Sequence, residues 1–526
     1  MKHLLLRRFS TSLDIAKNSS STKQSADGSV LRGRKWNPLP IPHRTTPEPK
    51  GQDLDYVNVA YSYLVHAEWT KLNELVSGLT PFRVQYVLLK IQRDPVLSFE
   101  FYNWVQQQRP SIHTLEIRSI VLHILTKANR FKYAESLLRS IIGPNTGDSS
   151  SNIFETVLYS FRVCDSSPRV FDSLFKTYAH LKKFRNATNV FCSMKEYGFL
   201  PNVESCNAYM SSLLEYDRAD IALAFYKEMR RCRISPNIYT LNMVIRAHCK
   251  LGKLEKAVEM FGDIESMNCR PNIVSFNTLI AGYCKRGLMG LAMKLKNTMG
   301  KNECHPSVVT YNTLIYGLCK EGKLHEANRV LNEMKAVDVA PNTVTYNTLI
   351  NGYTQVCNSE MGGRVYEEMQ MNRVKANILT YNSLILGLCK EGKTKKAAYL
   401  VKELDKDKLV PNASTFHALI TGQSVRKNSE RAFLIYKSMK KSGCHPNADT
   451  FKMLISTFCK NEDFDGAVQV LMDMMERSMS PESSLLGELL EGLINCRKVE
   501  VATKLCQDMK TRHLLPKDFD KSKFDI

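Results

Sequence analysis

The sequence lacks the features that mark several common classes of protein. No run approaches 18 apolar residues, so we expect no membrane-spanning helix. Fifteen cysteines are present, but no two of them have the CxxC spacing of zinc or redox sites. Neither a P-loop nor a glycine-rich dinucleotide motif occurs. We therefore expect no metal and no cofactor, and the cysteines favour a reducing compartment.

Acidic residues are also scarce relative to basic ones. The chain has 73 Lys and Arg against 52 Asp and Glu, a net charge of +21, which favours nucleic acid or another anionic partner. In residues 1–35 the only acids are Asp14 and Asp27, whereas Arg, Lys and Ser are frequent. This composition predicts an organellar transit peptide, with a disordered basic tail as the alternative. Residues 8–12, RFSTS, resemble mitochondrial processing sites, so the mitochondrion is favoured over the chloroplast.

The dominant feature is a pattern that recurs every 35 residues. Residues 308–342 are VVTYNTLIYGLCKEGKLHEANRVLNEMKAVDVAPN, and residues 378–412 begin ILTYNSLILGLCKEGK. The register holds over ten repeats, each named below by its first residue: 168, 203, 238, 273, 308, 343, 378, 413, 448 and 483. In each repeat two helical patterns flank a polar or glycine break. The sequence predicts an all-α protein, a right-handed α-solenoid of about ten 35-residue helix-turn-helix repeats with an irregular helical N-terminal cap.

The remaining segments complete the expected domain organisation. Residues 36–52 are rich in proline and predict a linker. Residues 53–167 predict a helical cap with degenerate repeats, in which Thr80-Pro81 and Asp94-Pro95 are expected to begin helices. The repeat array covers 168–517, and 518–526 form a C-terminal tail.

Three positions of the repeat are expected to fill the core. The twentieth residue is alanine in nine of the ten repeats, which allows two helices to approach closely. The twenty-seventh residue is usually methionine, a flexible core filler. Five cysteines fall at the twelfth residue, near the end of the first helix, and are expected at helix–helix contacts: Cys249, Cys284, Cys319, Cys389 and Cys459.

These features together resemble the P-class pentatricopeptide repeat proteins of plant organelles. The resemblance rests on the 35-residue period, the VTYNTLI opening, the alanine of the second helix and the closing Pro-Asn. Tetratricopeptide repeats are similar hairpins, but their period is 34 residues and their Trp-Leu-Gly-Tyr pattern is missing here. The resemblance implies single-stranded RNA bound along the solenoid, with one base for each repeat.

In this family the fifth and last residues of each repeat select the base. The resemblance assigns this role to the pairs Asn207–Asn237, Asn242–Asn272, Asn277–Ser307, Asn312–Asn342, Asn347–Asn377 and Asn382–Asn412. The family's code then predicts six pyrimidines with cytosine third, in RNA that runs 5′ to 3′ from the N- to the C-terminus. A structural alternative is that each closing asparagine simply caps the next helix.

Two further positions have roles implied by the resemblance or by their charge. The second residue of each repeat packs on base faces in this family, here Tyr239, Val274, Val309, Val344 and Leu379. The thirteenth residue is often lysine and is a candidate phosphate contact: Lys250, Lys285, Lys320, Lys390 and Lys460. Solvated helix ends, which favour positive charge, are the alternative for these lysines.

The terminal repeats depart from the family's pattern. Their pairs are Asp172–Asn202, His417–Asn447, Lys452–Glu482 and Gly487–Lys517. Base reading is therefore expected only from 203 to 412, and the repeats at 413–517 are expected to serve as cap or protein contact.

The expected function is binding and not catalysis. His66-Ala67-Glu68 matches the HxE element of deaminases, but no CxxC follows it, so we interpret it as chance. The nine residues after the array leave no room for a nuclease domain. We expect an organellar RNA-binding protein that acts in stabilisation, processing, splicing or translation of a specific mitochondrial transcript. Its partners would be RNA with a pyrimidine-rich core and organellar RNA-processing factors. The alternative is a protein–protein interaction scaffold of the tetratricopeptide kind.

Overall fold

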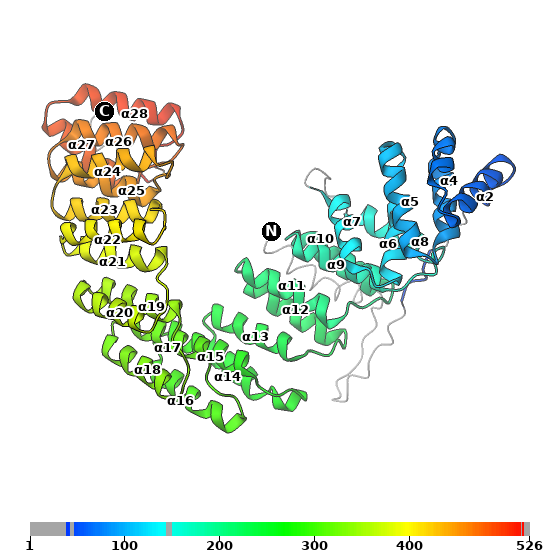
Figure 1. Ribbon diagram of the computed structural model, residues 1–526, viewed down its shortest axis with the longest axis horizontal. Coiled ribbons are helices and arrows are strands. Elements are labelled where there is room, and N and C mark those ends of the chain that lie inside the picture. Colours follow the sequence, from blue (N-terminus) through cyan, green and yellow to red (C-terminus); the bar gives the residue numbers. More distant parts are fainter. Residues whose placement is uncertain (1–37, 43–46, 144–149, 517, 520–526) are drawn as a thin grey trace, which may run out of the picture. The chain divides into compact units, whose positions relative to one another are not determined.

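The computed structural model describes residues 38–42, 47–143, 150–516 and 518–519. Within these ranges the regular structure is entirely helical. The chain forms two compact parts, residues 1–282 and 283–526, in each of which paired helices stack one after another (Figure 1). The prediction of an all-α solenoid is confirmed. The predicted transit peptide, 1–35, lies outside the described residues, and the domain boundaries stay predictions.

The first part begins with helices of irregular length. These are α2 (Gln52–Val65), α3 (Trp69–Leu72), α4 (Pro81–Ile91), α5 (Pro95–Gln108), α6 (Leu115–Lys127), α7 (Phe131–Ile142) and α8 (Ser150–Ser160). The Thr80 hydroxyl accepts a hydrogen bond from the Arg83 N–H at the start of α4. The Asp94 carboxylate accepts two at the start of α5. Both helix starts predicted from a capping residue before proline are confirmed.

Regular hairpins follow in the first part. They are α9 (Arg169–His180) with α10 (Phe184–Glu196), α11 (Val203–Glu215) with α12 (Ala219–Arg231), and α13 (Ile238–Lys250) with α14 (Leu254–Gly262). Helix α15 (Ile273–Lys285) contains the boundary between the two parts.

The second part continues the same alternation. Its helices are α16 (Met289–Met299), α17 (Val308–Lys320), α18 (Leu324–Ala336), α19 (Thr343–Gln355), α20 (Ser359–Met371), α21 (Ile378–Lys390), α22 (Thr394–Lys406), α23 (Ala413–Val425), α24 (Ser429–Lys441), α25 (Ala448–Lys460), α26 (Phe464–Glu476), α27 (Ser483–Asn495) and α28 (Val499–Thr511). In this part, from α17 onwards, the first helix of a repeat packs against the first helix of the next, as α19 does on α21 and α21 on α23.

The core positions predicted from the repeat are buried. All nine alanines at the twentieth residue have no exposed surface, and the methionines at the twenty-seventh are 0–3% exposed. Small and flexible side chains at these places let successive hairpins pack at the density of a protein interior.

The repeated cysteines lie against glycines of the following repeat. A Cβ atom placed on Gly317 would come within 2.8 Å of Cys284 Cβ, and one on Gly422 within 2.7 Å of Cys389 Sγ. All fifteen cysteines are free thiols. Burial raises the pKa of the Cys284, Cys319, Cys389 and Cys459 thiols to about 12. These thiols are inert packing groups, as expected.

A buried histidine makes the first part sensitive to acid. His123 on α6 has no exposed surface, and its Nε2 lies 3.0 Å from the Val157 carbonyl oxygen. Burial lowers its pKa to about 4, whereas the unfolded chain takes up the proton near pH 6.5. The contribution of neutral His123 to the free energy of unfolding is therefore complete above pH 6.5. We expect it to fall by up to about 1.4 kcal/mol per pH unit as the pH drops from 6.5 towards 4.

Tryptophan fluorescence during urea unfolding measures this effect, since all three tryptophans lie between residues 36 and 104. The variant His123→Gln should show a shallower pH dependence than the wild type. His113, whose burial also lowers its pKa to about 4, would supply the remaining slope. Equal slopes in the two proteins would contradict the role of His123.

Candidate nucleic-acid interface

Within a repeat, the fifth residue and the closing residue lie side by side. The Nδ2 atom of the fifth-residue asparagine donates a hydrogen bond to Oδ1 of the closing asparagine. The donor–acceptor distances are 3.0 Å for Asn207–Asn237, 3.2 Å for Asn242–Asn272, 3.3 Å for Asn312–Asn342, 3.1 Å for Asn347–Asn377 and 3.0 Å for Asn382–Asn412. In the sixth pair, Asn277 belongs to the first part and Ser307 to the second. The structure thus brings together five of the pairs singled out in the sequence, and their role in base selection stays a prediction.

Each closing asparagine also caps a helix. In repeat 308, Asn342 Oδ1 accepts a hydrogen bond of 3.1 Å from the Thr345 N–H at the start of α19. The Asn342 N–H in turn donates to Thr345 Oγ1, which completes a capping box. The capping alternative is therefore correct as a description of the structure. It does not use the Nδ2 atom of Asn342, for which the described part of the chain supplies no hydrogen-bond partner.

A threonine whose role was not predicted from the sequence holds the fifth-residue asparagine in place. The Thr345 hydroxyl donates to Asn312 Oδ1 at 2.6 Å. The same bond joins Thr240 to Asn207, Thr380 to Asn347 and Thr415 to Asn382. The signal was present in the sequence, because threonine recurs as the third residue in VTYN and LTYN. This contact fixes the amide so that its N–H groups have a defined direction.

Repeat 238 departs from this arrangement. The third residue of the next repeat is Ser275, whose hydroxyl lies 3.0 Å from Asn272 Oδ1. Asn242 is 6% exposed, and its Oδ1 finds no hydrogen-bond donor among the residues that the structure describes. A buried acceptor without a partner is costly, so the Asn242 amide is held less favourably than the fifth-residue asparagines that a threonine contacts.

Large apolar side chains stand exposed next to these pairs. The predicted base-packing residues Tyr239, Val274, Val309, Val344 and Leu379 are 54–66% exposed. Residues 2, 5, 9 and 13 of a repeat are three or four positions apart and so share one face of the first helix. We call this face, with the closing residue beside it, the reading face. The same exposed apolar position thus recurs beside the asparagine pairs within each part, which makes the reading face a candidate binding surface.

The lysines at the thirteenth residue are not equivalent. Lys250 Nζ donates to the Leu214 carbonyl at 2.7 Å and lies 3.1 Å from an Asp217 carboxylate oxygen. Lys285, Lys320 and Lys460 are exposed and Lys390 is half-buried, and none of the four has an ion pair among the described residues. The structure therefore leaves four of the five lysines available for an anionic partner.

The terminal repeats carry different chemistry at the same positions. Lys452 Nζ forms an ion pair of 2.5 Å with Glu482, in the place where the asparagine pairs lie elsewhere. His417 Nδ1 lies 3.2 Å from Thr450 Oγ1, and burial lowers the pKa of its imidazole. Asp172 accepts the Asn202 backbone N–H at 2.9 Å, and burial raises the pKa of its carboxyl. Lys517 lies outside the described residues.

The segment that matches the deaminase element shows no metal-binding arrangement. Glu68 forms an exposed ion pair with Lys71, and the His66 ring bonds the Ser62 carbonyl. No group of three or more His, Cys, Asp or Glu able to hold a metal occurs in the described ranges. Nor does the described chain contain a helix long and apolar enough to cross a membrane.

Family models match the array along nearly all of residues 169–479. The model described as PPR repeat family matches 201–250, 271–320, 306–355 and 341–390. The pentatricopeptide repeat domain matches 400–461, and the PPR repeat matches 169–199, 239–269, 379–409 and 449–479. The chain belongs to the pentatricopeptide repeat family.

Curated relatives match only part of this chain. A mitochondrial pentatricopeptide repeat-containing protein of Arabidopsis thaliana is 63% identical over 196 residues, which are 37% of this chain and 38% of the relative. Another pentatricopeptide repeat-containing protein of Arabidopsis thaliana, whose description names no compartment, is 31% identical over 167 residues, 31% of this chain and 22% of the relative. The matches thus span less than two fifths of either relative.

A solved pentatricopeptide repeat structure shares the fold. The crystal structure of the pentatricopeptide repeat protein PPR10 in complex with an 18-nt psaJ RNA element is 18% identical. The match covers 90% of this chain and 81% of that one, with a TM-score of 0.50.

Proposed function

We propose that this pentatricopeptide repeat protein binds single-stranded RNA, with one base at each of the six repeats from 203 to 378. The observation that carries the proposal is the recurrence of a fixed asparagine pair beside an exposed apolar side chain. An exposed residue such as Val309 or Tyr239 would pack on the faces of successive bases. The asparagine amides would meet the edge of the base between them. RNA bound to the solved relative is consistent with this use of the fold.

The pyrimidine preference in this proposal is taken from the family's code, and the Asn342 side chain is compatible with it. The Nδ2 group of a closing residue such as Asn342 can donate to a base oxygen. Cytosine and uracil both present a carbonyl oxygen at ring position 2, so an Asn–Asn pair would accept either. Ser307 in place of the closing asparagine is proposed to favour cytosine at the third base. The proposed core is thus six pyrimidines with cytosine third, read 5′ to 3′ from repeat 203 onwards.

The proposal also includes a role in the cell. The chain would act as a non-catalytic binder that stabilises, processes, splices or helps translate a mitochondrial transcript, together with RNA-processing factors. The mitochondrial description of the relative that is 63% identical supports this compartment over the chloroplast.

Selection from a randomised single-stranded RNA pool by the full chain tests the proposal. We expect enrichment of a pyrimidine tract with cytosine in its third place. If the four available lysines and no others neutralise phosphates, the slope of log K against log salt should be about −3. Binding without enrichment would remove the base code and leave a basic surface. Absence of RNA binding would favour the protein scaffold instead.

A further inference from the structure

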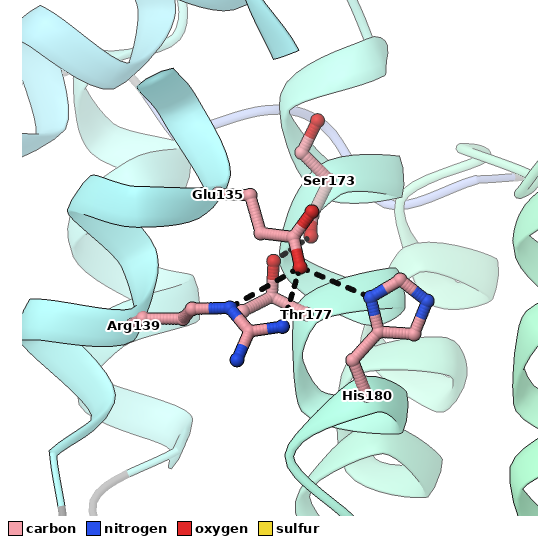
Figure 2. A network of polar contacts seen from close by, with 5 residues as sticks. All are labelled: Glu135, Arg139, Ser173, Thr177 and His180. Atoms are coloured by element: carbon pink, nitrogen blue, oxygen red, sulfur yellow. Dashed lines mark hydrogen bonds and ion pairs between the residues drawn. The ribbon is translucent and has the colours of Figure 1, made fainter. Parts of the chain in front are cut away.

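Helix α7 lies against the reading face of repeat 168. Glu135 of α7 points towards α9, and its Oε1 lies 3.0 Å from His180 Nδ1 (Figure 2). Arg139, one turn further along α7, donates to the same carboxylate oxygen at 2.8 Å. His180 is the thirteenth residue of repeat 168, the place that an available lysine occupies in repeats 273, 308 and 378. In repeat 168 this position is therefore engaged by a neighbouring helix.

The other functional positions of repeat 168 are engaged as well. Arg169, the second residue, donates to Asn129 Oδ1 at 2.5 Å, just before α7 begins. Asp172, the fifth residue, accepts the backbone N–H of Asn202. Repeat 168 thus has no exposed apolar residue at its second position and no asparagine pair at its fifth and last positions.

A cavity of about 500 Å³ remains between α7, α9 and the start of α11. It has the size of a pocket for a small ligand, roughly 300–1,000 Å³. Phe131 of α7, which is 44% exposed, contributes an aromatic wall. Lys176 of α9, the ninth residue of repeat 168, also lines the cavity and has no ion pair among the described residues. Asp172 and Glu204 place carboxylates in the same lining.

We propose that α7 is the end wall of the RNA track and that this cavity receives the single nucleotide 5′ of the six-base core. The inference rests on the proposed function and its 5′ to 3′ direction. The base of that nucleotide stacks on Phe131, because an aromatic ring can pack on any base. The Lys176 ammonium contacts its phosphate, and the Asp172 and Glu204 carboxylates accept from base N–H groups. RNA further 5′ leaves the protein at this point.

Oligonucleotides of graded length test the proposal with the full chain. Each carries the six-nucleotide core and a constant 3′ tail, with zero, one, two or three nucleotides added at the 5′ side. Binding is measured at about 0.3 M salt, where distant phosphates are screened. The first added nucleotide should strengthen binding about tenfold, the amount expected for one stacked base. The second and third should change the affinity by less than about twofold.

Two protein variants and one modified oligonucleotide separate binding in the cavity from a general effect on RNA affinity. The variant Phe131→Ala should lose most of the gain from the first nucleotide and keep the affinity for the core alone. Tyr133→Ala is the matched variant, since Tyr133 also stands exposed on α7 but contacts Phe99 and does not line the cavity. It should keep the gain. An abasic first nucleotide should lose most of it as well, because its phosphate remains but its base is missing.

Two results would overturn the inference while the proposed function stands. Equal gains for each of the three added nucleotides would mean that RNA continues past α7. No gain from the first nucleotide would mean that the cavity holds none. If the core oligonucleotide itself fails to bind, the proposed function fails instead.

Discussion

Replacing Asn312, Asn347 and Asn382 together with alanine should remove the preference for pyrimidines at three neighbouring bases. Each substitution deletes an amide that is fixed by a threonine and by the closing asparagine. A net hydrogen bond contributes about 1 kcal/mol, so three lost contacts should weaken binding of the cognate tract roughly 100-fold. Competition between cognate RNA and an all-adenine oligonucleotide of equal length measures the loss. The affinity for the all-adenine RNA should change little.

The matched control is Lys452→Ala. It alters the same fifth position in repeat 448, where an ion pair with Glu482 takes the place of the asparagine pair. This variant should keep the pyrimidine preference unchanged. Circular dichroism checks that both proteins remain helical. An unchanged preference in the triple variant would show that these amides do not select bases.

Gly317→Ala should destabilise the array although alanine is the better helix former. The added methyl would lie 2.8 Å from Cys284 Cβ and 2.8 Å from Met289 Sδ, and the Cys284 Cβ is fixed by its backbone. Overpacking of this kind costs about 1–3 kcal/mol, more than the gain of up to about 1 kcal/mol in helix propensity. We expect a lower midpoint of thermal unfolding, followed by circular dichroism.

Gly363→Ala in α20 is the corresponding substitution in open space. A Cβ there meets no atom within 4 Å, so only the propensity gain remains. Its unfolding midpoint should equal or exceed that of the wild type. If both variants rise alike, the contact between the first helices of repeats 273 and 308 is looser than the structure indicates.

The regular repeats could be predicted from the sequence because local signals and packing agree in them. At Asn342 and Thr343, for example, a capping residue precedes an apolar pattern of helical period, and α19 begins where both signals indicate. The alanine and cysteine positions were predictable for the same reason, since each repeats an identical packing environment. The asparagine pairs were found only through the family resemblance. Composition alone did not distinguish a base contact from a cap.

The irregular features could not be predicted, because they arise from tertiary contacts that no local sequence pattern indicates. Lys250 matches the other thirteenth-residue lysines, yet it is bound to Asp217, 33 residues earlier in the chain. The stretch that contains α7 resembles the second helix of a degenerate repeat, but it lies against the reading face of α9. The inserted helix α8 packs against both α6 and α10, and such tertiary packing overrides a weak repeat pattern. Long-range ion pairs and an inserted helix have no local periodicity to reveal them.

The capping box at closing residues such as Asn342, Asn377 and Asn412 would limit how the proposed base preference could be changed. A substitution of Asn342 that is meant to change the proposed base preference also changes the N-cap of α19, which contributes about 1 kcal/mol. Asn, Asp, Ser and Thr satisfy the helix, whereas most other residues would weaken the solenoid at that joint. Glu482, which makes no capping bond with its side chain, stands where a repeat has left this set. Few residue types are therefore compatible with the closing position, because helix stability restricts them independently of any contact with RNA.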